Sequence, residues 1–274
     1  DQARRQEREW LSYVRDAYRI LPGYLQTRRS ASAIVVASRD TLQQMPRSFR
    51  GKCVYLPENA IDPARFSARR TRQATPPIRA VFLGRLVPYK GCDMLLEASI
   101  DLIRAGKLTI EIIGDGPGRP KLDRIVEAHK LQPGVTFAGW VKHTEVQHHL
   151  ADADVFAFPS IREFGGGVAV EAMAVGLPPM VVAYGGLAEL VTDRTGWLIP
   201  MGSRASIVEA LRSNLTRLCD NPDEIDRKSP AALRRAHEQF TWDAKARMTL
   251  EIYRWVVGER PGKPDFGLPF PDPL

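Results

Sequence analysis

Residues 158–191 have the sequence FPSIREFGGGVAVEAMAVGLPPMVVAYGGLAELV, which predicts an anion site at the end of a strand. The apolar run Val155–Phe158 indicates a strand that stops at Pro159. A glycine triplet at 165–167 then leads into an Ala- and Val-rich segment that indicates the start of a helix. Because glycines leave backbone N–H groups bare and the positive end of a helix dipole attracts anions, this turn favours a phosphate group.

Two carboxylates flank the glycine triplet. Glu163 lies in the loop before it, where a carboxylate can accept hydrogen bonds from sugar hydroxyls. Glu171 lies about one helical turn after the triplet, a position suited to a vicinal diol such as ribose. A glycine triplet or a surface glutamate alone belongs more often to an ordinary solvated loop or helix. The prediction therefore depends on the combination and on its neighbours in the chain.

A second cluster of charge follows an earlier strand. Residues 79–98 read RAVFLGRLVPYKGCDMLLEA, in which the apolar run Ala80–Leu83 predicts a strand. Arg85 and Lys90 follow the carboxyl end of this strand, where ligands bind in open α/β sheets. The two cations suit a diphosphate, because arginine can hold it through two parallel hydrogen bonds while lysine acts as a point charge.

The motifs together resemble the family 4 retaining glycosyltransferases of the GT-B fold. Seven residues separate the two glutamates, and EAMAVGLP continues the pattern. Three further segments resemble that family in the same order: LTIEIIGDGPG at 108–118, VTFAGWV at 135–141 and LADADVFAFPS at 150–160. The resemblance covers about residues 31–257.

The resemblance implies an α/β protein of GT-B type whose complete Rossmann-like domain binds a nucleotide diphosphate sugar. It implies transfer of a hexose-type unit to a hydroxyl acceptor with retention, without an enzymic nucleophile, the leaving diphosphate accepting the acceptor's proton. The residues that it places in catalysis are Arg85, Lys90 and Glu163. Those that it places around the donor are Gly84, Val141, Phe164, Gly165, Gly166, Gly167 and Glu171, with Val141 near a base that is read through backbone groups.

The domain organisation follows from the same resemblance. We expect the closing elements of an acceptor-binding domain at 1–66, a linker at 67–77 and the nucleotide-sugar domain at 78–240, followed by a terminal helix at 241–258 and an irregular tail at 259–274. Most of the acceptor-binding domain is therefore expected to be absent from these residues, which would leave the chain able to bind donor but catalytically incomplete.

Within the first region we expect a basic helix to about Leu21, a turn at Pro22-Gly23, and a strand at 33–37 with a helix from Ser38. A second strand is expected at residues 52–56. Ala60 stands where the family usually has glycine, which puts the local turn geometry in question.

Two motifs have the spacing of a metal site or a dinucleotide site, but their neighbouring residues argue against both. Asp152-Ala153-Asp154 has the spacing of an acidic metal site, but it precedes an apolar strand and better fits the end of a helix. Gly114-Asp115-Gly116 begins a dinucleotide fingerprint whose third glycine would fall at Arg119. The five histidines show no metal-ligand spacing. We expect no metal and no cofactor.

Composition predicts a soluble globular protein of the cytoplasm. The chain has 274 residues, 44% of them hydrophobic, and three scattered cysteines that give no disulfide framework. No apolar run reaches the roughly 20 residues of a membrane span. The net charge of +7 comes without a nucleic-acid recognition motif. An apolar stripe between Trp10 and Leu21 beside arginines leaves peripheral contact with the inner face of an anionic membrane open.

Expected partners are the nucleotide-sugar donor and a saccharide or lipid-linked acceptor. Three other interpretations stay open. The chain could be a non-hydrolysing sugar-nucleotide epimerase, against which the glutamate spacing argues, a non-catalytic nucleotide-sugar binding module, or a basic adaptor for membranes or nucleic acid. The sequence alone names neither the sugar, nor the base, nor the acceptor.

Overall fold

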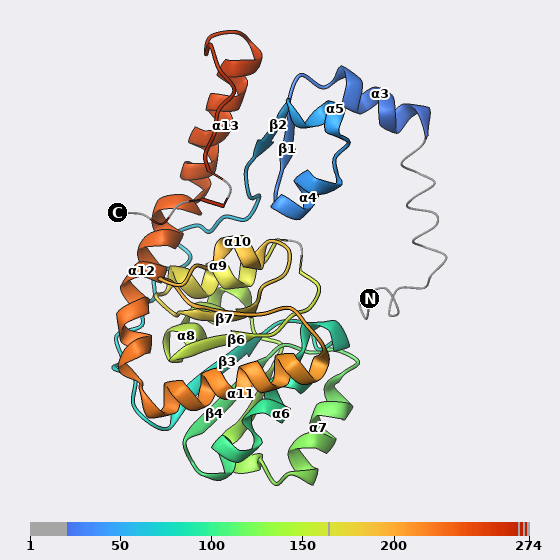
Figure 1. The fold of residues 1–274 in the computed structure, drawn as a ribbon. Coiled ribbons are helices and arrows are strands. Elements are labelled where there is room, and N and C mark those ends of the chain that lie inside the picture. The colour runs from blue at the N-terminus through green and yellow to red at the C-terminus, as the bar shows by residue number, and fades with distance from the viewer. Residues whose placement is uncertain (1–20, 164, 268, 271, 273–274) are drawn as a thin grey trace.

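A computed structural model of the protein describes residues 21–163, 165–267, 269, 270 and 272. The basic helix and apolar stripe expected up to Leu21 fall almost entirely outside these residues. Figure 1 shows a large α/β region below a smaller one, with the C-terminal helices running beside both. No helix of the described part is both long and apolar enough to cross a bilayer.

The large region is built on a six-stranded sheet in which every pairing is parallel. Its strands are β3 (Ile78–Leu83), β4 (Leu108–Ile113), β5 (Val135–Gly139), β6 (Val155–Phe158), β7 (Pro179–Val182) and β8 (Trp197–Ile199). The spatial order is β5-β4-β3-β6-β7-β8, which counted within this sheet is 3-2-1-4-5-6. This is the order of the doubly wound fold, and it confirms the predicted α/β class.

Helices connect consecutive strands up to β8, and α11, α12 and α13 follow β8. The helices are η1 (Pro88–Lys90), α6 (Cys92–Arg104), α7 (Arg119–Ala128), η2 (Gln132–Gly134), α8 (His143–Ala151), α9 (Gly167–Ala174), α10 (Leu187–Leu190), α11 (Arg204–Asp220), α12 (Asp223–Gln239) and α13 (Trp242–Val256). Helix α6 packs against α11, and α9 packs against α12. Covered on both sides, the central strands are apolar at successive positions.

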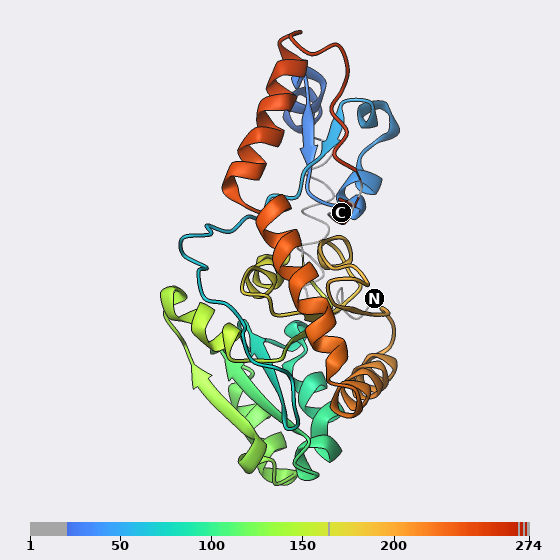
Figure 2. The same ribbon diagram turned by 90° about the vertical axis from the view of Figure 1, so that its left-hand side faces the viewer.

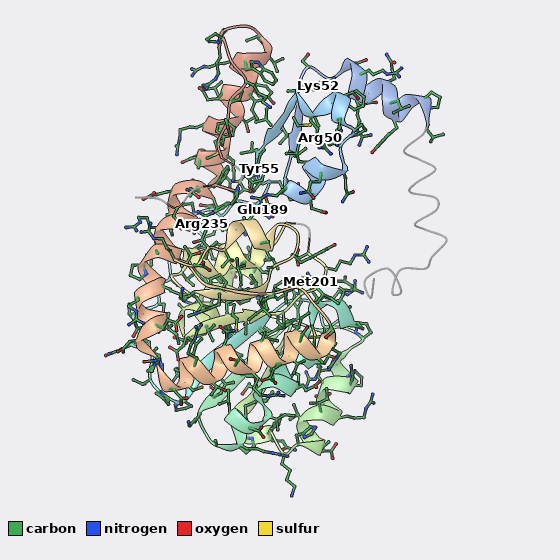
Figure 3. The ribbon with its side chains drawn as sticks, viewed as in Figure 1. Arg50, Lys52, Tyr55, Glu189, Met201 and Arg235 are labelled. Carbon is green, nitrogen blue, oxygen red and sulfur yellow. The ribbon has the colours of Figure 1, made fainter. Side chains whose placement is uncertain are left out.

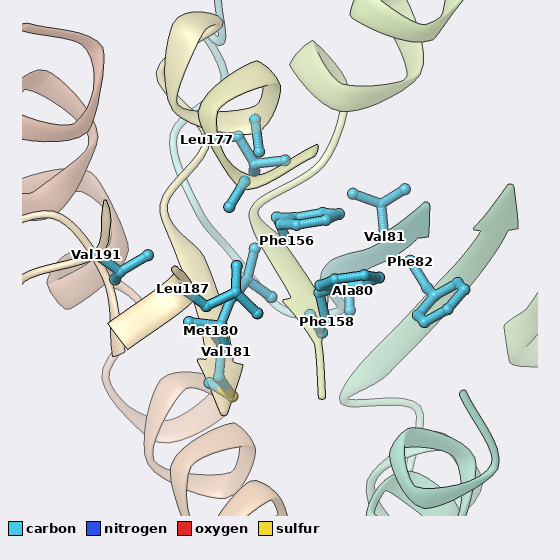
Figure 4. Close-up of a cluster of buried hydrophobic side chains, with 14 of the residues drawn as sticks. Ala80, Val81, Phe82, Phe156, Phe158, Leu177, Met180, Val181, Leu187 and Val191 are labelled. Atoms are coloured by element: carbon cyan, nitrogen blue, oxygen red, sulfur yellow. The ribbon is translucent and has the colours of Figure 1, made fainter. Parts of the chain in front are cut away.

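The core lies around β6 and β7, whose residues are all buried. Figure 4 shows aromatic and aliphatic side chains from β3, β6 and β7 meeting in one cluster. The Phe158 ring lies 5.5 Å from that of Phe156 and 5.6 Å from that of Phe82, measured between centroids. The loops that carry the predicted site residues therefore begin at strands that are packed in the core.

The small region contains one pair of parallel strands, β1 (Ile34–Val36) and β2 (Cys53–Tyr55). Helices α3 (Pro22–Ser30), α4 (Arg39–Gln44) and α5 (Arg47–Arg50) accompany them. Ser38 begins α4 as expected, because its hydroxyl accepts a hydrogen bond from the Thr41 amide at 3.1 Å. The turn predicted at Pro22-Gly23 is wrong, since α3 begins there. Proline suits the first helical position as well as it suits a turn.

The segment between the two regions is anchored by charge. The Asp154 carboxylate is fully buried at the start of β6. Arg70 reaches it at 3.0 Å and Arg72 at 2.9 Å, and the Arg79 amide donates to it at 2.9 Å. Asp152 ends α8, as expected, whereas Asp154 ties the linker to the sheet. A buried carboxylate with these partners explains the acidic pair without a metal.

The C-terminal segments join the two regions. Figure 2 shows α12 and α13 running one after the other along the molecule, with the tail returning beside the small region. The tail has no helix or strand in its described residues, yet Phe270 is buried and its ring lies 5.3 Å from that of Tyr55 in β2. The buried Arg235 donates to the Phe270 carbonyl at 3.0 Å and to the Asp272 carboxylate at 3.2 Å.

A buried lysine lies in this junction. Lys245 is 6% exposed, and its ammonium lies 4.5 Å from the centre of the Phe240 ring and 4.7 Å from that of Phe270. It has no hydrogen-bond partner among the described residues. Burial, with a smaller contribution from the Arg235 charge, lowers the pKa of Lys245 to about 7.

We expect Lys245 to make stability rise with pH. Above pH 7 the folded protein releases a proton that the unfolded chain keeps up to a pKa near 10.5, so the free energy of unfolding increases across that range. Urea denaturation at pH 6.5 and pH 9 should show wild type gaining about 2 kcal/mol more than Lys245→Met. Lys107→Met, at a half-exposed lysine paired with Asp220, serves as the control. Equal pH dependence in wild type and Lys245→Met would contradict the assignment.

Candidate functional site

The predicted site residues follow two strands that are neighbours in the sheet. Strands β3 and β6 pair directly, and the chain order reverses between them. The loops after β3 and β6 leave the same edge, since the strands are parallel. In open α/β sheets this point of reversal is where a crevice forms and ligands bind.

An ion pair joins the two loops. The Lys90 ammonium contacts the Glu163 carboxylate, and the two side chains are only 18% and 16% exposed. The Glu163 carboxylate also accepts a hydrogen bond from the Gly166 amide at 3.3 Å. Lys90 lies 5.0 Å from the centre of the Phe158 ring, on the last residue of β6. The structure therefore brings together two of the three predicted catalytic residues.

Gly91 permits this close approach. It follows Lys90 with φ of 75°, a left-handed conformation that favours glycine. A Cβ atom there would lie 2.3 Å from the carbonyl oxygen of Pro159, in the loop after β6. Any side chain at this position would push the two loops apart and separate Lys90 from Glu163.

The glycine triplet forms the start of α9, as predicted. Gly166 is the residue before the helix and has φ of 73°, while Gly167 is its first residue. The amide of Asn59 donates to the Gly165 carbonyl, so the segment before the linker holds the loop in place. Backbone N–H groups at the start of a helix favour an anion. Phe164, also predicted to contact the donor, lies outside the described residues.

A pocket of about 560 Å³ opens beside these loops. Four predicted residues line it: Gly84, Arg85, Val141 and Glu171. The other lining residues are Leu83, Ile113, Gly114, Asp115, Trp140, His143, Val146 and Val168. Arg85 is exposed and belongs to the same loop as Lys90, so this loop connects the pocket to the ion pair. Lys90, Glu163 and the glycine triplet are not among the lining residues.

Glu171 lies on α9 about one helical turn after the glycine triplet, as predicted, and it lines this pocket. Its side chain is 20% exposed, and its carboxylate hydrogen bonds to Nε2 of His143 at 3.0 Å. Burial raises the pKa of Glu171, and the hydrogen bond from His143 opposes that shift. The carboxylate thus has one oriented partner and an accessible pocket in front of it.

Sequence reasoning missed three residues of the pocket. His143 was considered only among five histidines without metal-ligand spacing, Asp115 was set aside with the dinucleotide pattern, and Trp140 was not singled out. Trp140 is 75% exposed although it is a large aromatic residue. The position of all three after β4 or β5, whose ends meet the same edge, is the signal that could have found them. The described residues contain no cluster of His, Cys, Asp and Glu that could hold a metal.

Comparison with curated proteins shows partial likeness to longer chains. The chain is 34% identical over 215 residues to D-inositol 3-phosphate glycosyltransferase of Kineococcus radiotolerans, covering 71% of this chain and 48% of the relative. It is 34% identical over 211 residues to glycogen synthase of Mycobacterium tuberculosis, covering 75% of this chain and 50% of the relative. The chain thus spans about half the length of these two curated relatives.

Solved structures share the fold at low identity. A glycosyltransferase of Rickettsia africae matches with a TM-score of 0.71 and 17% identity, over 88% of this chain and 69% of that one. The Anabaena protein HepE, solved with UDP, matches with a TM-score of 0.68 and 21% identity, over 83% and 65%. These likenesses confirm the predicted GT-B type of fold.

The family model described as "Glycosyl transferases group 1" matches residues 65–229, which is more than half of the chain. The matched segment includes both loops that the Lys90–Glu163 pair joins, and both glutamates. The chain belongs to the group 1 glycosyltransferases.

Proposed function

We propose that the protein takes a sugar from a nucleotide diphosphate sugar and passes it to a hydroxyl acceptor with retention of configuration. The observation that carries the proposal is the Lys90–Glu163 pair at the junction of β3 and β6, next to a pocket that holds Arg85 and Glu171. Two cations that can bind a diphosphate and two carboxylates that can bind hydroxyl groups therefore lie along one edge of the sheet.

Each group has a separate role in the proposal. Arg85 and Lys90 bind the diphosphate and stabilise the charge that develops on it as it leaves, assisted by the amides at the start of α9. Glu163 accepts hydrogen bonds from the transferred sugar, and Glu171 accepts them from ribose. Before donor binds, Glu163 is the counter-charge of Lys90, and the diphosphate takes over that function.

The reaction then proceeds on one face of the sugar. The bond between the anomeric carbon and the phosphate oxygen breaks while the acceptor oxygen bonds to that carbon from the same side. The acceptor's proton passes to the leaving phosphate, so no enzymic nucleophile is required. Two fixed cations neutralise the leaving group, which is why we propose no metal. Loss of one such stabilising donor typically lowers the rate about 10²- to 10³-fold.

Solved relatives of similar fold support a nucleotide in the site. HepE was also solved in complex with UDP and glucose, and a pneumococcal O-GlcNAc transferase in complex with UDP and GlcNAc. We propose a nucleotide diphosphate sugar of the same class here, with a saccharide or lipid-linked acceptor. Membership of the group 1 family does not favour the epimerase interpretation.

We expect nucleotide diphosphate binding to depend on Arg85 and Lys90. Thermal melting of wild type should rise with one of UDP, GDP, ADP, CMP or dTDP, in proportion to the logarithm of its excess over Kd, and the double variant Arg85→Ala, Lys90→Ala should lose that rise. Lys107→Ala with Arg212→Ala removes the same charge from exposed sites on the surface. A rise that survives in the Arg85, Lys90 variant would refute the phosphate assignment.

We expect substitutions of the two members of the ion pair to change pyrophosphate affinity in opposite directions. Glu163→Gln frees the Lys90 ammonium, so inorganic pyrophosphate should bind about two- to fivefold more tightly by calorimetry. Lys90→Met removes the cation and should weaken binding about tenfold or more. Glu209→Gln, which removes an exposed carboxylate from an ion pair on α11, should change neither value. Weaker binding by Glu163→Gln would show that Glu163 does not compete with phosphate.

We further propose that these 274 residues form the donor half of the transferase, because they span about half of the curated relatives. Transfer requires the acceptor to be held about 3–3.5 Å from the reacting carbon, and acceptor contacts need additional chain. The chain should bind the nucleotide. When it is given the matching nucleotide sugar, it should form little free nucleotide, with or without sugar acceptors. Multiple turnovers by this chain would contradict the proposal.

A further inference from the structure

His143 lies between two contacts, Glu171 in the donor pocket on one side and Phe66 on the other. It is the first residue of α8 and lines the pocket with Glu171. On one side its Nε2 hydrogen bonds to Oε1 of Glu171 at 3.0 Å. On the other side its ring meets that of Phe66 edge-on, with centroids 5.5 Å apart and planes at 75°. The imidazole is therefore fixed in position although half of it is exposed.

The contact with Phe66 is itself anchored. Phe66 is 3% exposed, so its ring is part of the core. One turn along α8 from His143, the Gln147 side-chain oxygen accepts hydrogen bonds from the amides of Ser67 at 2.9 Å and Ala68 at 3.0 Å. The same helix thus holds both the histidine and the backbone just after Phe66. This arrangement leaves the imidazole little freedom to turn away from Glu171.

The hydrogen bond orients the Glu171 carboxylate. Contact at Oε1 restricts rotation of the group, while the side chain still lines the pocket that a ligand would enter. A carboxylate that has to meet two neighbouring hydroxyl groups requires such an orientation, because both contacts depend on its rotation about the side-chain axis. Burial of Glu171 makes this partner matter more, since hydrogen bonds are stronger where water is excluded.

We propose that His143 is a positioning residue that holds Glu171 for the vicinal hydroxyls of the nucleotide ribose, and so sets the preference for ribonucleotides over 2′-deoxyribonucleotides. The inference rests on the proposed nucleotide site. It assigns to His143 a contact with Glu171 and with Phe66, and no part in the bond-breaking step.

The test compares paired ligands that differ by one hydroxyl. Calorimetry would measure the Kd of UDP against dUDP, ADP against dADP and GDP against dGDP, and the pair that binds wild type would be carried forward. His143→Leu should lower the ratio of ribonucleotide affinity to 2′-deoxyribonucleotide affinity about threefold to tenfold. The reason is that the charged carboxylate of Glu171 loses the hydrogen bond that orients it. His143→Gln, which keeps an N–H donor, should restore most of the ratio. Inorganic pyrophosphate should bind all three proteins equally.

Two control variants separate this inference from the function on which it rests. His148→Leu changes an exposed histidine on the same helix and should leave the ratio unchanged. Glu171→Ala should abolish the preference for the ribonucleotide. Absence of nucleotide binding in wild type would overturn the proposed site and this inference with it, and a preference that survives Glu171→Ala would overturn the role of Glu171.

Three results would overturn the role of His143 alone. One is a ratio that falls in Glu171→Ala and stays at the wild-type value in His143→Leu. Another is failure of His143→Gln to recover any of the lost preference. The third is a loss of pyrophosphate affinity in His143→Leu as large as its loss of nucleotide affinity, which would indicate general damage to the pocket.

Discussion

The ion pair between Lys90 and Glu163 is the contact around which the candidate site is arranged. It connects the loop after β3 to the loop after β6, two segments far apart in sequence that the strand order makes neighbours. Gly91 lets the loops approach, and the buried Phe158 fixes the strand end beneath the ammonium. A partly buried pair of opposite charges would suit the proposed exchange of the carboxylate for a diphosphate, since the cation would never be buried alone.

Much of the fold and of the site follows from the sequence. Apolar runs with glycine and proline boundaries predict strands where β3, β4, β5 and β6 occur, and Arg85, Lys90, Glu163 and Glu171 lie at the strand ends or helix start predicted for them. What a linear pattern lacks is the order of strands in space. Lys90 meets Glu163 because β3 pairs with β6, a consequence of long-range packing. His143 meets Glu171 because α8 lies beside α9.

Local composition misleads where packing decides. A tail rich in proline and glycine indicates irregular backbone, yet it also places Phe270 in the core beside Lys245. Asp154 has the appearance of a helix-ending residue and is in fact the buried anchor of two linker arginines. Both cases depend on partners at least 25 residues away along the chain.

The two regions are also joined by polar contacts close to the site. Figure 3 places Tyr55 of the small region, Glu189 of α10 and Arg235 of α12 around one junction. The Glu189 carboxylate accepts a hydrogen bond from the Arg39 amide at 2.7 Å, and its own carbonyl accepts one from Arg235 at 3.2 Å. The large region and the small region are thus connected through Glu189 of α10, which follows the turn after β7.

A crystal structure of the chain with the nucleoside diphosphate that binds it would test the proposed site most directly. We expect the diphosphate at the ends of β3 and β6, in contact with Arg85 and Lys90, with Glu163 released from Lys90 and the ribose hydroxyls on Glu171. A diphosphate bound elsewhere on the protein, with the Lys90–Glu163 pair unchanged, would contradict it.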